Sequence, residues 1–153
     1  MKRPIVVAAG GTGGHFFPAE AVATVLAERG HDLVLMTDAR HGRRETGLFK
    51  DRPQYVLDGA GVAGKGLGGK VRGITALFRG MLEARRILKT LDATAVVGFG
   101  GYPSIPPLLA SCVLPKSQRP EMAIHEGNAR PAQANASLSR FAPAIPPPSA
   151  SVA

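Results

Sequence analysis

Short apolar runs alternate with longer stretches of helical periodicity along this chain. Buried strands are predicted at Ile5–Ala8, Leu33–Met36, Tyr55–Leu57, Ala95–Phe99 and Met122–Ile124. Helices are predicted at Pro18–Arg29, with Pro18 in the first turn and Gly30 as the stop, and at Val71–Leu91, Ser104–Val113 and Gln133–Phe141. Strands that alternate with helices indicate an α/β fold, a doubly wound parallel sheet of Rossmann-like type.

The prolines change the pattern at the end of the chain. Ten of the thirteen lie from Pro103 onward, and four of them fall between residues 143 and 148. Proline has no N–H to donate, so this segment is not expected to pair inside a sheet. We therefore expect one folded domain over residues 1–141, followed by an extended or disordered tail over 142–153.

Length and composition exclude several classes of protein. A chain of 153 residues with 44% apolar and 20% charged residues is typical of one globular domain and not of a disordered chain. The single cysteine, Cys112, excludes an internal disulfide framework and a thiolate metal cluster, and its apolar neighbours favour a buried small side chain over a reactive thiol. No run reaches the 18–20 apolar residues, roughly, of a membrane span, and the one after Met1 is too short for a signal peptide. We therefore expect a cytoplasmic protein.

The charge is concentrated in one segment. Residues 40–89 contain twelve basic and four acidic residues, which accounts for the whole net charge of +8. Such a segment indicates an anionic partner, with a solvated face as the alternative. Within it, Val71–Leu91 combines an apolar face with basic positions, which fits a bilayer surface as well as a core-packed crossover helix, and the two can coexist. Few aromatic residues accompany the basic ones, so we do not expect nucleic-acid binding. The candidate membrane patch comprises Lys65, Lys70, Arg72, Ile74, Leu77, Phe78, Arg79, Arg85 and Arg86.

A glycine-rich loop, Gly10-Gly11-Thr12-Gly13-Gly14-His15, separates the first predicted strand from the first helix. Glycines there let the backbone approach a ligand, and the helix N-terminus favours a phosphate. His15 is a candidate general base, because the positive potential at a helix N-terminus favours the neutral ring. The dinucleotide fingerprint is incomplete, since Phe16 occupies its third glycine position. Asp38 nevertheless stands about where a ribose-binding acid would lie, so a nicotinamide enzyme is an alternative.

Two further motifs follow later predicted strands. They are Gly98-Phe99-Gly100-Gly101-Tyr102-Pro103-Ser104 and His125-Glu126-Gly127-Asn128. Ligands of open α/β sheets bind outside the carboxyl ends of the strands, so all three motifs should face one crevice. Glu126 could orient a histidine or accept sugar hydroxyls, and Asn128 can both donate and accept hydrogen bonds.

These three motifs, in this order and spacing, resemble the N-terminal domain of the MurG family, and the similarity runs from about residue 4 to 141. The resemblance implies one half of a GT-B glycosyltransferase that works by inversion, without metal or cofactor. It implies transfer of N-acetylglucosamine from UDP-N-acetylglucosamine to lipid I, which gives lipid II. In the family this half mainly holds the lipid-linked acceptor and docks on the cytoplasmic face of the bacterial inner membrane, a role that the basic segment matches.

The resemblance also implies roles for single residues. It places His15 as the candidate base with Glu126 in support, and a contact with UDP-N-acetylglucosamine at Thr12, Gly13, Gly14 and Asn128. The residues expected near the acceptor diphosphate are Gly10, Gly11, Gly100, Gly101, Tyr102 and His125. Gly127 departs from the family, which usually has Gln there.

We expect this chain to lack the C-terminal donor domain of the family, and therefore to transfer little or no sugar alone. One alternative is an acceptor-binding membrane subunit completed by a separate donor-domain chain. A less favoured alternative is the nicotinamide-dependent oxidoreductase.

Overall fold

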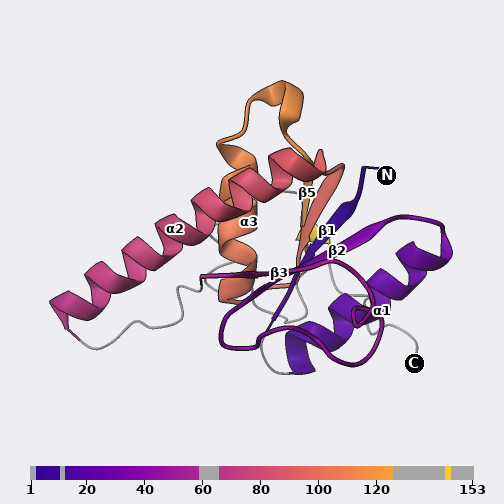
Figure 1. Cartoon of the computed structure of the whole chain (residues 1–153), viewed down its shortest axis with the longest axis horizontal. Coiled ribbons are helices and arrows are strands. Elements are labelled where there is room, and N and C mark those ends of the chain that lie inside the picture. Colours follow the sequence, from indigo (N-terminus) through magenta and orange to yellow (C-terminus); the bar gives the residue numbers. More distant parts are fainter. Residues whose placement is uncertain (1–2, 11–12, 59–65, 126–143, 146–153) are drawn as a thin grey trace, which may run out of the picture.

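The computed structural model describes residues 3–10, 13–58, 66–125 and 144–145. Within them the sheet has six parallel strands in the order β3-β2-β1-β4-β5-β6 (Figure 1). The strands are β1 (Ile5–Ala8), β2 (Leu33–Asp38), β3 (Gln54–Leu57), β4 (Ala95–Gly98), β5 (Glu121–His125) and β6 (Ala144–Ile145). The helices are α1 (Gly13–Glu28), α2 (Leu67–Leu91), α3 (Ile105–Cys112) and two short 3₁₀ turns, η1 (Tyr102–Ser104) and η2 (Lys116–Gln118). The predicted doubly wound parallel sheet is confirmed.

Both faces of the sheet are covered, and β1 shows why its sequence is apolar throughout. Val7 and Ala9 belong to the core under α1, together with Phe49 from the segment between β2 and β3. Val6 and Ala8 point to the opposite face and join the core under α2 and α3. A parallel strand with a core on each side has no polar face, so it reads as a continuous hydrophobic run.

Helix α1 begins earlier than the prediction from Pro18. It starts at Gly13, so Pro18 lies inside the helix and the expectation that it stands in the first turn is wrong. Gly30, with φ of +80°, ends the helix as predicted. Its N–H donates to the carbonyl of Ala27 at 2.9 Å. The correction matters for the site, because it puts Gly13, Gly14 and His15 into the first helical turn.

The last described strand lies within the segment predicted as a tail. Ala144 and Ile145 pair in parallel with Ile124 and His125 of β5, so this part of the predicted 142–153 tail belongs to the sheet. The edge position explains how a proline-rich sequence can supply a strand, since an edge strand needs to pair on one side only. The predicted helix Gln133–Phe141 and the rest of the tail lie outside the described residues.

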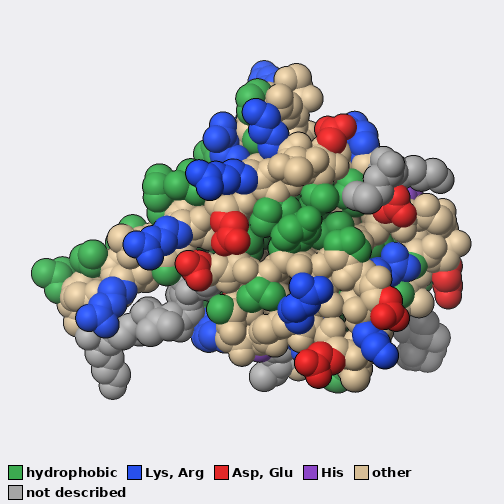
Figure 2. Space-filling view, viewed as in Figure 1, with side chains coloured by type: hydrophobic (Ala, Val, Ile, Leu, Met, Phe, Trp, Pro, Cys, Tyr) green, Lys and Arg blue, Asp and Glu red, His purple; other side chains and the backbone are tan. Residues whose placement is uncertain are grey.

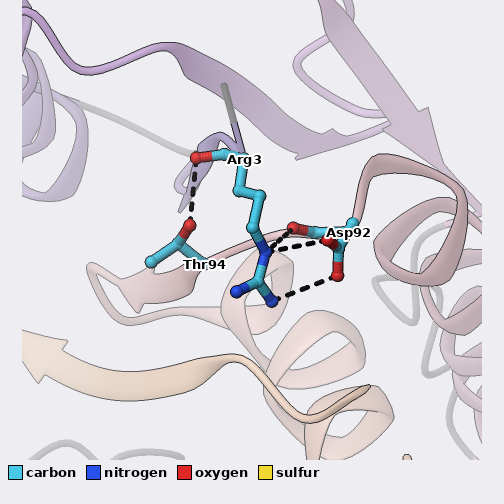
Figure 3. A network of polar contacts seen from close by, with 3 residues as sticks. All are labelled: Arg3, Asp92 and Thr94. Carbon is cyan, nitrogen blue, oxygen red and sulfur yellow. Dashed lines mark hydrogen bonds and ion pairs between the residues drawn. The ribbon is translucent and has the colours of Figure 1, made fainter. Parts of the chain in front are cut away.

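A polar network ties the start of β1 to the end of α2 (Figure 3). The Nε of Arg3 lies 2.8 Å from the Oδ2 of Asp92 and donates to the Asp92 carbonyl at 3.0 Å. The hydroxyl of Thr94 donates to the Arg3 carbonyl at 3.0 Å. Asp92 caps α2 in the left-handed region, with φ of +47°, where Asp is better tolerated than most residues. The network therefore fixes the turn through which α2 enters β4.

Helix α2 has a packed half and a projecting half. Gly80, Ala84 and Leu88 are buried in its C-terminal half, where a Cβ on Gly80 would lie 2.7 Å from the carbonyl oxygen of Asp58. The N-terminal half, which starts at Leu67 rather than at the predicted Val71, extends away from the sheet (Figure 1). Among the described residues, no helix combines the length and the apolar character that a membrane span requires.

Candidate functional site

The two glycine loops meet above the carboxyl ends of β1 and β4. Gly10 follows β1 and is buried against the second loop, so that a Cβ on it would lie 2.7 Å from Cγ of Pro103 and 3.0 Å from Oγ1 of Thr37. Any larger residue would push the loops apart. The two loops therefore lie against each other in their described residues, and the crevice that they are expected to face stays a prediction.

His15 lies at the junction of the loops. It is the third residue of α1 and is half-buried, and its Cδ2 atom would lie 3.9 Å from a Cβ on Gly101. Gly14 beside it is exposed, and no atom lies within 4 Å of the position of a Cβ there. The first turn of α1 thus leaves backbone N–H groups without helical partners next to an imidazole, which suits binding of an anion close to a proton acceptor.

The second loop needs its glycines for their backbone conformation. Gly100 and Gly101 have φ of +86° and +71°, a region that side chains other than glycine rarely adopt. The turn brings Tyr102 to the surface, where its side chain is 53% exposed. Gly101 thus lies close to His15, and the expected roles of Gly100, Gly101 and Tyr102 at the acceptor diphosphate stay predictions.

Sequence reasoning missed the residue that holds the loops in place. The buried hydroxyl of Ser104 lies 3.0 Å from two carbonyl oxygens, those of Ala8 in β1 and Gly100 in the second loop. The backbone N–H of Phe99 donates to the same Ala8 carbonyl at 3.0 Å. The signal in the sequence was a serine directly before a helix, which indicates a helix cap, but no capping hydrogen bond forms here.

The third motif is described only at its first residue. The ring of His125 stacks on Phe99 with centroids 5.2 Å apart, which places it beside the strand that leads into the second loop. Gly11, Thr12, Glu126, Gly127 and Asn128 lie outside the described residues, so their predicted roles stay predictions.

Asp38 does not have the setting of a ribose-binding acid. Its side chain is only 2% exposed, and the Oδ1 atom accepts hydrogen bonds from the backbone N–H and from Nδ1 of His41. The Nε of Arg40 lies 3.6 Å from Oδ2. A ribose-binding carboxylate has to reach the ligand, whereas this one is turned into the protein and faces His41 and Arg40. The geometry therefore argues against the nicotinamide alternative.

The projecting half of α2 carries an apolar stripe, formed by exposed side chains at helical spacing. Its members are Leu67 (82% exposed), Val71 (55%), Ile74 (67%), Phe78 (56%) and Leu82 (39%). Basic residues of the predicted patch flank it, and Lys70, Arg72, Arg79, Arg85 and Arg86 are all exposed. Figure 2 shows hydrophobic and basic side chains side by side along this helix. Leu77 was predicted as a member of the membrane patch, but it is partly buried and lies outside the exposed stripe. Lys65 lies outside the described residues.

A comparison with protein families shows to which family the chain belongs. Residues 5–147 match the glycosyltransferase family 28 N-terminal domain. The chain belongs to glycosyltransferase family 28. The predicted resemblance is therefore confirmed, and family membership replaces the oxidoreductase alternative.

Individual members of family 28 agree with this assignment. The chain is 83% identical over 145 residues to the UDP-N-acetylglucosamine--N-acetylmuramyl-(pentapeptide) pyrophosphoryl-undecaprenol N-acetylglucosamine transferase of Gluconobacter oxydans, covering 95% of this chain and 40% of that relative. It is 52% identical to the protein of the same name from Acidiphilium cryptum, covering 93% and 38%. The crystal structure of Acinetobacter baumannii MurG superimposes with a TM-score of 0.73 at 32% identity, covering 95% of this chain and 41% of that one. The chain thus spans about two fifths of the length of these relatives.

Proposed function

We propose that this family 28 domain is the acceptor-binding half of a transferase that moves N-acetylglucosamine from UDP-N-acetylglucosamine to lipid I and so makes lipid II. The observation that carries the proposal is the position of His15, at the point where the two glycine loops meet and 3.9 Å from the Cβ position of Gly101. Relatives at up to 83% identity carry the name of this transferase. Because they are longer than this chain, the donor-binding part of the reaction is assigned to the sequence that it does not cover.

The crevice suits a diphosphate. The first turn of α1 offers backbone N–H groups at Gly13, Gly14 and His15, and the helix dipole favours an anion at the same place. Gly100 and Gly101 present backbone on the opposite side, and Tyr102 lies at the rim. Such a site would hold the acceptor by its diphosphate and leave the sugar hydroxyl near the imidazole. Thr12, Gly13, Gly14 and Asn128 are the candidates for further contacts with the sugar nucleotide.

The chemistry follows from this placement. The acceptor hydroxyl attacks the anomeric carbon of N-acetylglucosamine, His15 takes the hydroxyl proton, and the bond to the diphosphate of UDP breaks with inversion. Glu126 is the candidate that supports the base. Positioning and stabilisation of the departing negative charge supply most of the rate, and general-base catalysis contributes about 10²–10⁴-fold.

The apolar stripe of α2 supports the membrane side of the proposal. Five large hydrophobic side chains project from the molecule beside exposed arginines, and a lipid-linked acceptor is reached at a membrane surface. Apolar side chains would enter the boundary between headgroups and acyl chains, and the arginines would contact anionic headgroups. The domain would then act at the cytoplasmic face of the bacterial inner membrane as a peripheral protein.

The test is sugar transfer to a lipid I analogue. The chain is assayed alone and with the remaining sequence of the Gluconobacter oxydans relative supplied as a separate chain. We expect little or no sugar transfer by the chain alone and clear transfer in the complemented mixture. Efficient transfer by the chain alone would contradict the proposal that donor binding lies in the sequence it does not cover.

A pair of histidine variants tests the base. In the complemented assay, His15→Asn should lower kcat by about 10²–10⁴-fold. His31→Asn is the matched control, because His31 is exposed and follows the other end of α1. Equal rates for the two variants would remove His15 from the role of base.

A further inference from the structure

Arg40 lies beside Tyr102 of the second glycine loop but comes from neither loop. It follows β2, and its guanidinium carbon stands 5.7 Å from the centre of the Tyr102 ring in the second loop. Its side chain is 44% exposed, so the guanidinium is open to solvent. Strand β2 is the neighbour of β1, which places Arg40 on the side of the first glycine loop away from β4.

A buried carboxylate orients this arginine. Asp38 Oδ2 faces the Nε of Arg40 at 3.6 Å, and the side chain of Asp38 is only 2% exposed. The other oxygen of Asp38 binds His41 twice, through its backbone N–H at 3.3 Å and through Nδ1. Backbone bonds from His41 and Gly42 to the Asp38 carbonyl, both 3.1 Å, close the turn that contains Arg40. The turn therefore fixes the backbone of Arg40, and the attraction of the buried carboxylate favours one direction of its guanidinium.

The contact with Asp38 engages one edge of the guanidinium and leaves the other available. The ion pair uses Nε, so the two terminal nitrogens remain to donate hydrogen bonds beside Tyr102. A planar pair of donors matches two oxygens of a phosphate, and charge-assisted bonds of this kind are among the strongest in proteins. A buried aspartate that steadies the arginine reduces the side-chain entropy lost when the anion binds.

We propose that Arg40 binds the diphosphate of the lipid-linked acceptor, with Asp38 as the positioning residue that holds its guanidinium toward the crevice. The inference rests on the proposed function and adds a cation to a site that otherwise offers backbone N–H groups, an imidazole and a phenol. It also gives a role to Asp38, which sequence reasoning had considered only as a ribose ligand. The acceptor is favoured over the sugar nucleotide because Arg40 lies against the second loop, on which the proposed acceptor site is built.

The experiment measures binding of farnesyl diphosphate, a short soluble mimic of the lipid diphosphate, to the 153-residue chain. Arg40→Ala should weaken binding by about tenfold or more, as expected for loss of a charge-assisted hydrogen bond. Arg43→Ala is the matched control, because Arg43 is exposed, carries the same charge and lies in the same loop. The control should change the affinity by less than about twofold.

Three further measurements separate the source of the anion and the role of Asp38. Farnesyl monophosphate should be less sensitive to Arg40→Ala than the diphosphate. Arg40→Lys should recover only part of the affinity, because lysine keeps the charge but lacks the planar pair of donors. Asp38→Asn should weaken ligand binding by the wild-type chain and should not weaken it further in the Arg40→Ala chain. If Asp38 had a purely structural role, the substitution would weaken ligand binding by the same factor in both chains. Circular dichroism checks folding of Asp38→Asn, and the Arg40 variants test the proposal even if that variant unfolds.

The outcomes distinguish this inference from the proposed function. If the wild-type chain binds farnesyl diphosphate and Arg40→Ala binds it equally well, the inference is wrong and the acceptor role stands. If the wild-type chain does not bind it at all, the acceptor role and the inference fail together. If Arg40→Ala selectively weakens binding of UDP-N-acetylglucosamine, or of vesicles containing phosphatidylglycerol, the arginine serves another anion and its assignment to the acceptor is overturned.

Discussion

The hydroxyl of Ser104 lies 3.0 Å from the carbonyl oxygen of Ala8, at the last residue of β1. The two residues are far apart in sequence, and this contact joins the ends of the two strands whose loops form the crevice. Since the same hydroxyl lies 3.0 Å from the Gly100 carbonyl, one buried side chain fixes the first loop relative to the second. The geometry of the site therefore depends on a residue that touches no substrate in the proposed reaction.

Replacing Ser104 with alanine should cost stability and binding together. Loss of a buried hydroxyl that serves two carbonyls is expected to lower the free energy of unfolding by about 1–3 kcal/mol. Farnesyl diphosphate should also bind more weakly, because the loops are no longer tied together. Urea unfolding and ligand titration measure the two effects. Ser111→Ala is the control, since that hydroxyl is equally buried but bonds to Pro107 within α3. Unchanged ligand affinity in Ser104→Ala would show that the loops keep their places without it.

The first loop permits a test that separates packing from ligand binding. A Cβ at Gly10 would lie 2.7 Å from Pro103 Cγ, so Gly10→Ala is expected to destabilise the domain by about 1–3 kcal/mol through overpacking. A Cβ at Gly14 meets nothing within 4 Å, so Gly14→Ala should leave the stability unchanged or slightly raised. Gly14→Ala should still weaken farnesyl diphosphate binding, because the methyl group would occupy the mouth of the crevice. Thermal unfolding of both variants, followed by ligand titration, checks this, and a strongly destabilised Gly14→Ala would contradict it.

The turn at Asp92 predicts an unusual order of stability. Asp92→Ala loses the ion pair with Arg3 and puts alanine at a φ of +47°, so we expect a loss of about 1–2 kcal/mol. Asp92→Gly loses the same ion pair but relieves the backbone, so it should be destabilised less than the alanine variant. Arg3→Ala isolates the ion pair, whose partners are 54% and 64% exposed, and should cost less than about 1 kcal/mol. Urea midpoints rank the variants, and an alanine variant as stable as the glycine one would contradict the role of the backbone.

The cysteine should react slowly. Burial raises the pKa of the Cys112 thiol, and the nearby charge of Arg119 offsets part of this effect. The rate of alkylation by iodoacetamide should therefore rise at a higher pH than for the chain unfolded in urea, and Arg119→Ala should shift the profile upward again. Because the pKa of Cys112 is higher in the folded chain than in the unfolded chain, the protonated thiol contributes its full share of the free energy of unfolding below the unfolded-chain pKa. That contribution is lost as pH rises through the folded-chain pKa. Identical profiles for folded and unfolded chains would refute this.

The sequence predicted the strands better than the helix starts and the polar contacts. Apolar runs such as Ile5–Ala8 are unambiguous, since both faces of a parallel strand are buried. The start of α1 was misplaced because a proline usually marks a first turn, whereas here Gly13 and Gly14 already have helical geometry. The short strand Ala144–Ile145 was missed because its pairing on one side of β5 comes from tertiary contact, which no local pattern reports.

For the site, too, local patterns were predictable from the sequence and tertiary contacts were not. Glycine motifs at strand ends predicted that the loops would meet, because the topology of an open parallel sheet dictates it. The contacts of Ser104 with Ala8, and of Arg40 with Tyr102, connect segments that are far apart in the sequence. Their geometry depends on side-chain positions that sequence spacing does not specify. The sequence therefore predicted that the loops meet, and the structure was needed to show which side chains hold them together.

The exposed stripe on α2 predicts membrane binding that depends on both apolar contact and charge. Ile74→Ser combined with Phe78→Ser should weaken binding to vesicles containing phosphatidylglycerol by about tenfold or more, because two large side chains no longer enter the bilayer. Val22→Ser combined with Val25→Ser is the matched control, since these valines are also exposed but lie on α1. Charge reversal at Arg79, Arg85 and Arg86 should weaken binding most at low salt, where screening is least. Sedimentation with vesicles at two salt concentrations measures each variant. Equal losses in the α1 and α2 pairs would mean that any exposed apolar side chain suffices, and α2 would then have no special role at the membrane.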